Sequence, residues 1–433
     1  MANDFSKEER VAFEQLLEGF QDSLVLSRNV SVYRTDQTMM ERASDVIWRP
    51  MPYISESFDG MDQTANFRDY VQLSVPAKIG FSKSVPFVLD AKELRDALQE
   101  GRLGDAAKQK LASDINVAIM NVASQQGTLV VRRTGTDYGF DDVASCEAAM
   151  NEVGVPSYDR YLALSTRDYN KLARDLANRQ NLTPGKTMTA YERAMVGMIA
   201  SFDTYKLDYA IRLTAATATG VTIDGANQYY VPVATRTDST GERSNVDNRY
   251  QVINVAVTSG TIKVGDCFTI ADVNSVHYIT KGDTGQPKTF RVTRIVSGGG
   301  GTGAIEISPP IISGQGGSAA EKSYKNVTAT PANGAPITFL NTASAYINPF
   351  WQKDALELLP GRYAVPSGSG AAVMRASTDQ GIEVVMQKFY DINTMKTKFR
   401  VDVLFGVVNK QPEMTGILLL DQVDTGGPRS PLF

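Results

Sequence analysis

The spacing of apolar residues changes along the chain, and these changes predict where its helices and strands lie. Two stretches near the N-terminus repeat an apolar residue every three or four positions, which is typical of helices with one buried face. The first is predicted at 6–24, with a capping box of Ser6 and Glu9, and its apolar positions are Phe13, Leu16, Leu17 and Phe20. The second is predicted at 102–126 and stops at Gly127. At 1.5 Å per residue it would be roughly 35 Å long.

Residues 45–90 predict a long two-stranded excursion between these helices. Val46-Ile47-Trp48 and Val71-Gln72-Leu73-Ser74-Val75 have strand-like composition, and the turn-rich stretch 55–66 between them holds few apolar residues. An isolated hairpin is only marginally stable in water. We therefore expect this one to become ordered against a neighbouring subunit.

The apolar spacing of residues 139–221 predicts both helices and strands, whereas the stretch that follows predicts strands alone. Helices are predicted after Asp141, at 168–178 and from a Thr189/Glu192 capping box, with a strand at 161–164. From Gly220 to about Ser344 helical spacing disappears, and Gly, Ser, Thr, Asn and Pro separate short β-rich runs at 251–257, 267–270, 289–296 and 304–307. This pattern predicts a small all-β barrel or sandwich inserted into an α/β parent. The mixed pattern resumes at Tyr346, predicts strands at 399–408 and 416–420, and ends in a loose tail, 425–433.

Composition narrows the classes of function. A chain of 433 residues with 42% apolar residues predicts two or three folded units. The net charge of -4 and the lack of a basic run argue against a nucleic-acid reader. No apolar stretch is long enough to span a bilayer, and the polar first ten residues do not form a signal peptide. Cys146 and Cys267 are expected to be buried free thiols in a reducing cytoplasm.

The search for chemistry finds no catalytic, cofactor or metal site. The single histidine, His277, excludes sites with several histidines and is interpreted as structural. The stretch 282–289 mimics a phosphate-binding loop, but Pro287 replaces a glycine and removes a needed N–H group. The glycine run 298–301 opens no helix, so it is read as a loop. Asp141 and Asp142 suit a helix start.

Short motifs along nearly the whole chain are similar to those of one family. They are Ile47-Trp48-Arg49-Pro50, Lys92-Glu93-Leu94-Arg95-Asp96, the stretch 121–130, Val246-Asp247-Asn248-Arg249-Tyr250 with the following Gly265-Asp266, and Phe350-Trp351 with Asp354-Ala355. In this order they resemble the major capsid proteins of tailed bacteriophages. In particular, they resemble the coat protein of the short-tailed transducing Salmonella phage group, whose members carry an extra β insertion domain. The loops 235–245 and 273–288 and the tail after Gln422 depart from the family's pattern.

The resemblance implies an α+β fold of the tailed-phage major capsid type with an inserted all-β, barrel-like domain. The expected parts are an N-terminal arm at 1–30, an extended loop hairpin with peripheral-domain strands at 31–91, and a spine helix region at 92–135. They continue with the first part of an axial domain at 136–221, the inserted β domain at 222–344, and the axial and peripheral return strands with the tail at 345–433.

The resemblance also implies function and partners. The chain would form hexamers and pentamers of an icosahedral shell, assembled with a scaffolding protein around a portal protein in the host cytoplasm. The shell would enclose double-stranded DNA without sequence-specific contact and would involve no membrane. Alternatives are an encapsulin-type compartment shell and, in a different class, a glycan-binding tail adhesin.

Three sets of residues are candidates for interaction. The first helix has an acidic face made by Asp4, Glu8, Glu9, Glu14, Glu18 and Asp22. From this face we take Glu14, Glu18 and Asp22 as a scaffold dock, with a merely solvated face as the alternative. Asp238, Glu242 and Arg243 form a charged turn that is expected to reach a neighbouring capsomer, or else to be an exposed turn without a partner. Trp48 is placed at the base of the extended loop.

Overall fold

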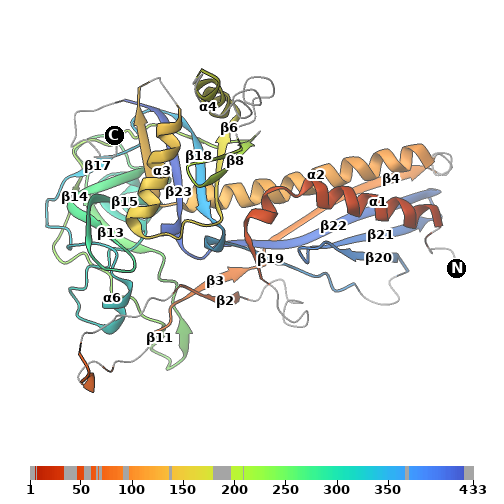
Figure 1. Cartoon of the computed structure of the whole chain (residues 1–433). Coiled ribbons are helices and arrows are strands. Elements are labelled where there is room, and N and C mark those ends of the chain that lie inside the picture. The colour runs from red at the N-terminus through yellow and green to blue at the C-terminus, as the bar shows by residue number, and fades with distance from the viewer. Residues whose placement is uncertain are drawn as a thin grey trace. The chain divides into compact units, whose positions relative to one another are not determined.

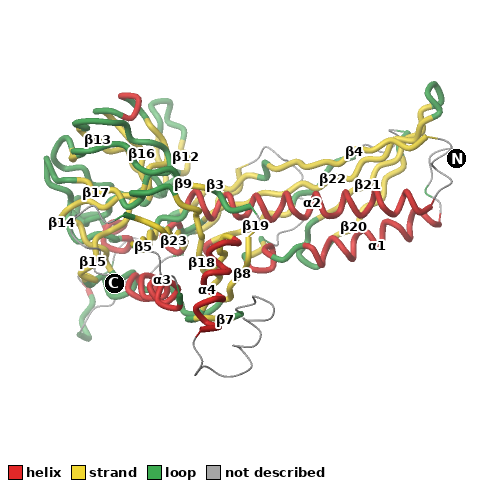
Figure 2. Tube along the Cα trace, turned by 90° about the horizontal axis from the view of Figure 1, so that it is seen from above, coloured by secondary structure: helices red, strands yellow, loops and turns green. Residues whose placement is uncertain are grey.

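The computed structural model describes residues 5, 7–33, 46–52, 60–64, 67, 71–90, 97–135, 139–178, 197–207, 209–365 and 370–423 (Figures 1 and 2). The helices are α1 (Lys7–Ser23), α2 (Ala97–Gln126), α3 (Phe140–Val153), α4 (Thr166–Asn178) and α6 (Ala319–Tyr324), with 3-10 turns η1 (Leu26–Asn29), η5 (Gly298–Gly300), η6 (Lys353–Ala355) and η7 (Pro412–Met414). The chain forms two compact units. Unit 1 holds 1–47, 76–122 and 356–408, and unit 2 holds 48–75, 123–355 and 409–433.

Unit 1 is built on a sheet flanked by helices. The sheet runs in the order β1 (Ser31–Val32), β19 (Leu356–Pro360), β22 (Lys396–Asn409), β21 (Glu383–Asp391), β20 (Ala372–Ser377), and β4 (Phe81–Asp90) also pairs with β22. Figures 1 and 2 show α1 and most of α2 running along this sheet. The predicted helical faces are buried, with Phe13 and Phe20 of α1 and Leu111 and Ile115 of α2 at most 6% exposed. The amphipathic spacing therefore fixes which face of each helix packs.

Unit 2 contains a mixed sheet covered by two helices. Its order is β5 (Leu129–Thr134), β23 (Thr415–Gln422), β18 (Ala345–Gln352), β6 (Arg160–Ser165), β8 (Phe202–Leu207), β7 (Met198–Ile199), and β9 (Arg212–Leu213) pairs with β18. Helix α3 packs on β5, and α4 packs on β6 and β8. Their shared core includes Cys146, Leu162, Phe202 and Phe350. Helix α3 ends at Gly154, whose φ of 90° supplies the left-handed turn that glycine tolerates best.

The strand-rich part of unit 2 has its own sheet. Strands β10 (Thr222–Ile223), β13 (Gln251–Ala256), β16 (Gly303–Ser308), β15 (Asp283–Ile295), β14 (Cys267–Val276) and β17 (Ile337–Phe339) pair in that order. Residues alternate between core and solvent along β13, so Ile253 is 1% exposed and Val252 is 49% exposed. We call residues 222–344 the insertion segment. Its boundaries, like those of the other parts expected from the sequence, remain a prediction.

The remaining strands form pairs. Strand β2 (Val46–Pro50) pairs with β3 (Ser74–Lys78), and β11 (Thr235–Thr237) pairs with β12 (Arg243–Asn245). The two-stranded excursion predicted at 45–90 is thus confirmed at its base. Its second strand begins at Ser74 rather than Val71, and most of the expected tip lies outside the described residues.

Most of the predicted elements that fall within the described residues are confirmed. The insertion segment contains a short helix, α6, that the sequence analysis missed; its own capping box, Ser318 with Glu321, starts it. The helix predicted from Thr189 lies outside the described residues. Gly127 does end α2, but it is not left-handed. A Cβ there would lie 3.0 Å from the Ala123 carbonyl oxygen and 3.3 Å from the Gly416 backbone, so this close approach of the two chain segments favours glycine.

Candidate functional site

The predicted charged turn is the end of a two-stranded hairpin. Thr235 pairs with Asn245 and Thr237 with Arg243, and all six strand residues of β11 and β12 are exposed. In the turn, the Asp238 amide donates to the Glu242 carbonyl at 2.9 Å, and Gly241 has a φ of 84°. Figure 1 shows this hairpin standing out from the neighbouring insertion-segment strands. The turn is therefore held by its own backbone.

The three predicted residues of this hairpin are not equivalent. Arg243 belongs to β12 rather than to the turn, and its Nη2 donates to Thr235 Oγ1 at 3.0 Å. Among the residues that the structure describes, the carboxylates of Asp238 and Glu242 make no hydrogen bond or ion pair. Two carboxylates are thus presented to solvent at the end of an ordered hairpin.

Asn248 fixes the base of the hairpin. This side chain is 2% exposed, and its Oδ1 accepts hydrogen bonds from the Tyr230 hydroxyl and the Val233 amide, both at 3.0 Å. Its Nδ2 donates to the carbonyls of Val233 and Val246. Burial raises the pKa of Tyr230, so its hydroxyl stays a donor at neutral pH. A buried asparagine with these partners resists rotation of the hairpin.

Arg249 ties the same base to a second part of unit 2. It forms a bidentate ion pair with Asp247 at 2.9 and 2.7 Å, and its Nη1 donates to the Asn409 carbonyl at 2.8 Å. Burial of this guanidinium opposes its charge, but the bonds to Asp247 outweigh burial and raise the pKa of Arg249. The sequence analysis found this motif only as a family resemblance, and the structure gives it an anchoring role.

The acidic face of α1 is narrower than predicted. Glu14 and Glu18 are exposed one turn apart, whereas Glu9 is 4% exposed and its Oε1 lies 2.5 Å from Lys388 Nζ. Glu9 therefore belongs to the packed side of the helix, and its assignment to the solvent face is wrong. The side chain of Asp22 lies outside the described residues. Trp48 lies in β2 and is half-buried.

The residues considered for chemistry have structural partners. His277 Nδ1 accepts hydrogen bonds from the Ile279 and Thr280 amides, and the ring lies against Gly154. The stretch that mimics a phosphate-binding loop lies in β15, where Lys288 forms a buried ion pair with Glu413. These contacts agree with the interpretations of His277 as structural and of 282–289 as a decoy, which remain predictions.

Asp142 serves the start of α3. It accepts from the Gly139 amide at 2.8 Å and pairs with Arg133 at 2.5 Å. Burial raises its pKa, which these two partners oppose. The predicted role of this carboxylate at a helix start is confirmed. The described residues contain no group of three or more His, Cys, Asp or Glu side chains placed to hold a metal ion, and no helix among them could cross a membrane.

Comparison with known proteins gives a family and several structural likenesses. The family model "P22 coat protein - gene protein 5" matches residues 1–420. A solved structure titled "CUS-3 coat protein I-domain" is 43% identical, with 28% of this chain and 95% of that chain covered, at a TM-score of 0.22. A structure from Mycobacterium phage Che8 is 11% identical, with 89% and 88% covered, at a TM-score of 0.42. The head of Helicobacter pylori bacteriophage KHP40 is 9% identical, with 91% and 88% covered, at a TM-score of 0.41.

The family match carries the identification, because it extends over residues 1–420 of 433 and agrees with the motifs found along the sequence. It favours a phage coat protein over an encapsulin-type shell or a tail adhesin. The mixed α+β fold expected from the resemblance is confirmed. The chain therefore belongs to the P22 coat protein family and is a major capsid protein, a structural subunit of an icosahedral phage shell and not an enzyme.

Proposed function

We propose that this coat protein builds its shell as hexamers and pentamers, with a scaffolding protein and around a portal protein, in the cytoplasm of the host bacterium. The shell encloses double-stranded DNA without reading its sequence. The net charge of -4 supports this last point, because a protein that grips phosphates needs a surplus of basic residues. Within this scheme, the β11–β12 hairpin joins one capsomer to the next.

The observation that carries the proposal is the contrast between the base and the turn of the hairpin. Asn248 and Arg249 are buried and bonded at the base, whereas Asp238 and Glu242 are exposed and have no side-chain partner among the described residues. A pre-ordered hairpin loses little conformational entropy on binding. Its two carboxylates suit a basic surface on a neighbouring subunit.

Charge reversal at the turn tests this proposal. An exposed ion pair contributes only ~0.2–1 kcal/mol, so Asp238→Lys with Glu242→Lys should leave the Tm of the free subunit unchanged. In a shell the same contact recurs at every equivalent position, and the small contributions act together. We expect open sheets, tubes or few closed shells from this variant, measured by electron microscopy and by sedimentation of assembly reactions.

The control is Asp203→Lys with Asp224→Lys. It changes the net charge by the same amount at two exposed positions outside the hairpin, in β8 and beside β10. This control should assemble closed shells at the normal yield. If the hairpin variant also gave a normal yield of closed shells, the proposed contact between capsomers would be contradicted and the turn would be merely solvated.

A further inference from the structure

The insertion segment meets the rest of unit 2 along β15, and polar side chains are buried there. Arg291 is 2% exposed and Lys288 is also 2% exposed. A buried charge is costly unless it is paired and hydrogen-bonded. Lys288 forms its ion pair, and Arg291 its hydrogen bonds, with groups outside the insertion segment, while Asp266 within the segment also favours the charge of Arg291.

Arg291 contacts the last turn of α2. An α-helix leaves the carbonyl groups of its last turn without backbone donors. The amide of Thr128, which would continue α2 by bonding to Ser124, donates instead to Thr415 at 2.9 Å and to Pro412. Arg291 Nη1 donates to the carbonyl of Ser124 and, at 3.3 Å, to that of Gly127. The guanidinium thus supplies a donor that the end of the helix lacks.

The charge of Arg291 also suits this position. The carbonyl end of a helix carries a partial negative charge, which a cation stabilises most effectively where water is excluded. Arg294, three residues further along β15, provides the contrast. Its side chain is 63% exposed and pairs at 2.8 Å with Glu306 of the adjacent strand β16. Only Arg291 reaches out of the segment's own sheet to the helix.

Two neighbouring residues of β15 extend the contact. Thr289 Oγ1 donates to the carbonyl of Thr128 at 2.6 Å. Lys288 forms its buried ion pair with Glu413 of η7, and Asn326 Nδ2 donates to the same carboxylate oxygen at 3.2 Å. The end of α2, the start of β5 and η7 are therefore all bonded to one stretch of β15.

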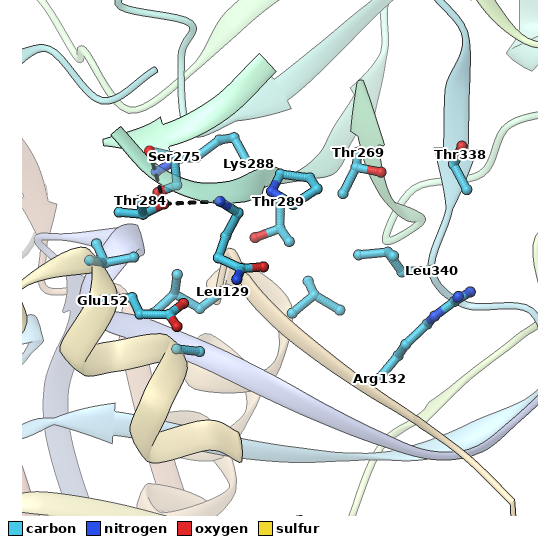
Figure 3. Close-up of a pocket in the computed structure, with 15 residues that line it drawn as sticks. Leu129, Arg132, Glu152, Thr269, Ser275, Thr284, Lys288, Thr289, Thr338 and Leu340 are labelled. Carbon is cyan, nitrogen blue, oxygen red and sulfur yellow. Dashed lines mark hydrogen bonds between the residues drawn. The ribbon is translucent and has the colours of Figure 1, made fainter. Parts of the chain in front are cut away.

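Packing beside these bonds is incomplete. A cavity of about 80 Å³ is lined by Leu129 and Glu152 on one side and by Ser275, Lys288 and Thr289 on the other. Figure 3 shows residues of α3 and β5 facing those of β14 and β15 across this space. Cavity walls lack the contacts that dense packing would give. The polar bonds of β15 therefore lie beside a gap in the apolar packing.

We propose that Arg291 caps the C-terminus of α2 from the insertion segment. As a result, the last turn of this helix and the contact between β15 and the rest of unit 2 open together. We call the three side chains that make these bonds, Lys288, Thr289 and Arg291, the latch. Arg291 acts as a positioning residue that ties the segment to the longest helix of the described chain. This coupling needs neither the scaffold dock nor the hairpin contact to be correct.

Cys267 reports the opening of the contact between the insertion segment and the rest of unit 2, and Cys146 serves as the internal control. Cys267 lies in an apolar cluster that joins the segment to the parent sheet, with Leu340 from the segment and Val130, Ile347 and Ile417 from the sheet. Cys146 lies in the separate core beneath α3. Both thiols are buried, so a thiol reagent reaches each one only after its own surroundings open.

The test compares Arg291→Met with the matched variant Arg294→Met in the full-length free subunit. We expect alkylation of Cys267 to be about tenfold faster in R291M, the factor that corresponds to ~1.4 kcal/mol. Cys146 should keep its wild-type rate. Hydrogen exchange of the Gly127 amide, which closes the last bond of α2 to Ala123, should accelerate in parallel. R294M should change neither rate.

Three results would overturn the proposal. They are a Cys267 rate no faster in R291M than in R294M, equal acceleration of both cysteines, and unchanged exchange at Gly127. Thr289→Val serves if R291M does not fold, because it removes one latch bond and keeps the side-chain shape. It should accelerate Cys267 and Gly127 severalfold and leave Cys146 unaffected, and wild-type rates would equally contradict the latch.

Discussion

At the scale of single residues, charged groups inside this coat protein are held by specific partners. Asp142 has Arg133 and the Gly139 amide, Lys288 has Glu413, and Glu9 has Lys388. Each arrangement offsets the cost of burying charge by a short, charge-assisted contact. These groups therefore support the packing of the subunit, in keeping with its structural role.

The two cysteines give a prediction at this scale. Burial raises the pKa of Cys267 to about 11 and raises that of Cys146 as well. Because the thiolate is the nucleophile, both should react far more slowly with iodoacetamide at pH 7.5 than a free cysteine, whose pKa is ~8.5. Mass spectrometry of the alkylated native subunit should find both thiols unmodified after a time that labels a cysteine-containing peptide completely.

Unfolding the subunit in urea supplies the control, since both cysteines should then alkylate at the rate of the peptide. Rapid stoichiometric labelling of either thiol in the native subunit would contradict its burial. An intermolecular disulfide in freshly purified native subunits would do the same.

At the scale of elements, the insertion segment has nearly all it needs to fold alone. The six strands of its larger sheet lie within 222–339, and the rings of Phe268 and Phe290 stack in its core with their centroids 5.7 Å apart. The same core also contains Ala218 and Val221, which precede the boundary predicted at residue 222. Ala216 also donates its amide to the Asn341 carbonyl at 2.8 Å.

We therefore expect a fragment of residues 216–344 to fold cooperatively and to be more stable than one of 222–344. Burying a valine side chain contributes roughly 1.5–3 kcal/mol, so the difference in the free energy of unfolding should be about 2 kcal/mol. Urea denaturation monitored by circular dichroism measures it. A fragment 216–344 without a cooperative transition, or without protected amides in β13 and β16, would contradict an independent segment.

The acidic face of α1 gives a second prediction for an element. Since Glu9 is buried in an ion pair with Lys388, Glu14 and Glu18 are the described acidic residues of this helix that are exposed to solvent. If they dock a basic segment of the scaffolding protein, Glu14→Lys with Glu18→Lys should weaken binding at low salt and flatten its salt dependence. Fluorescence anisotropy of labelled scaffolding protein across a salt series measures both.

The Asp203→Lys/Asp224→Lys variant is again the control, because it changes the net charge equally outside α1. It should bind scaffold with nearly the wild-type salt slope. Identical affinities and slopes for all three proteins would leave α1 with a merely solvated face.

At the scale of the whole molecule, the sequence predicted what depends on local spacing. The spacing at which apolar residues recur predicts the buried faces of α1 and α2, the strand β13 and the change to β structure near Gly220. The burial of Glu9 was missed although its spacing from Phe13, Leu16 and Phe20 places it on the same helical face. A charged residue on an apolar face needs a partner, and Lys388 lies 379 positions away.

The contacts between distant elements could not be predicted in this way. Arg291 and Ser124 are separated by 167 positions, and nothing in β15 indicates that one arginine reaches a helix end while Arg294 faces solvent. The hairpin candidates Asp238, Glu242 and Arg243 came from a charged turn combined with a family resemblance. The structure supplies what local spacing lacks, namely the buried base formed by Asn248 and Arg249.

The central claim is that this chain builds a closed shell, and electron microscopy of the protein co-expressed with its scaffolding protein tests it most directly. The account predicts closed icosahedral particles of uniform diameter, made of hexamers and pentamers, in which the β11–β12 hairpin of each hexamer subunit touches a neighbouring capsomer. Fibres, or only dispersed subunits at concentrations where the scaffolding protein is bound, would contradict it.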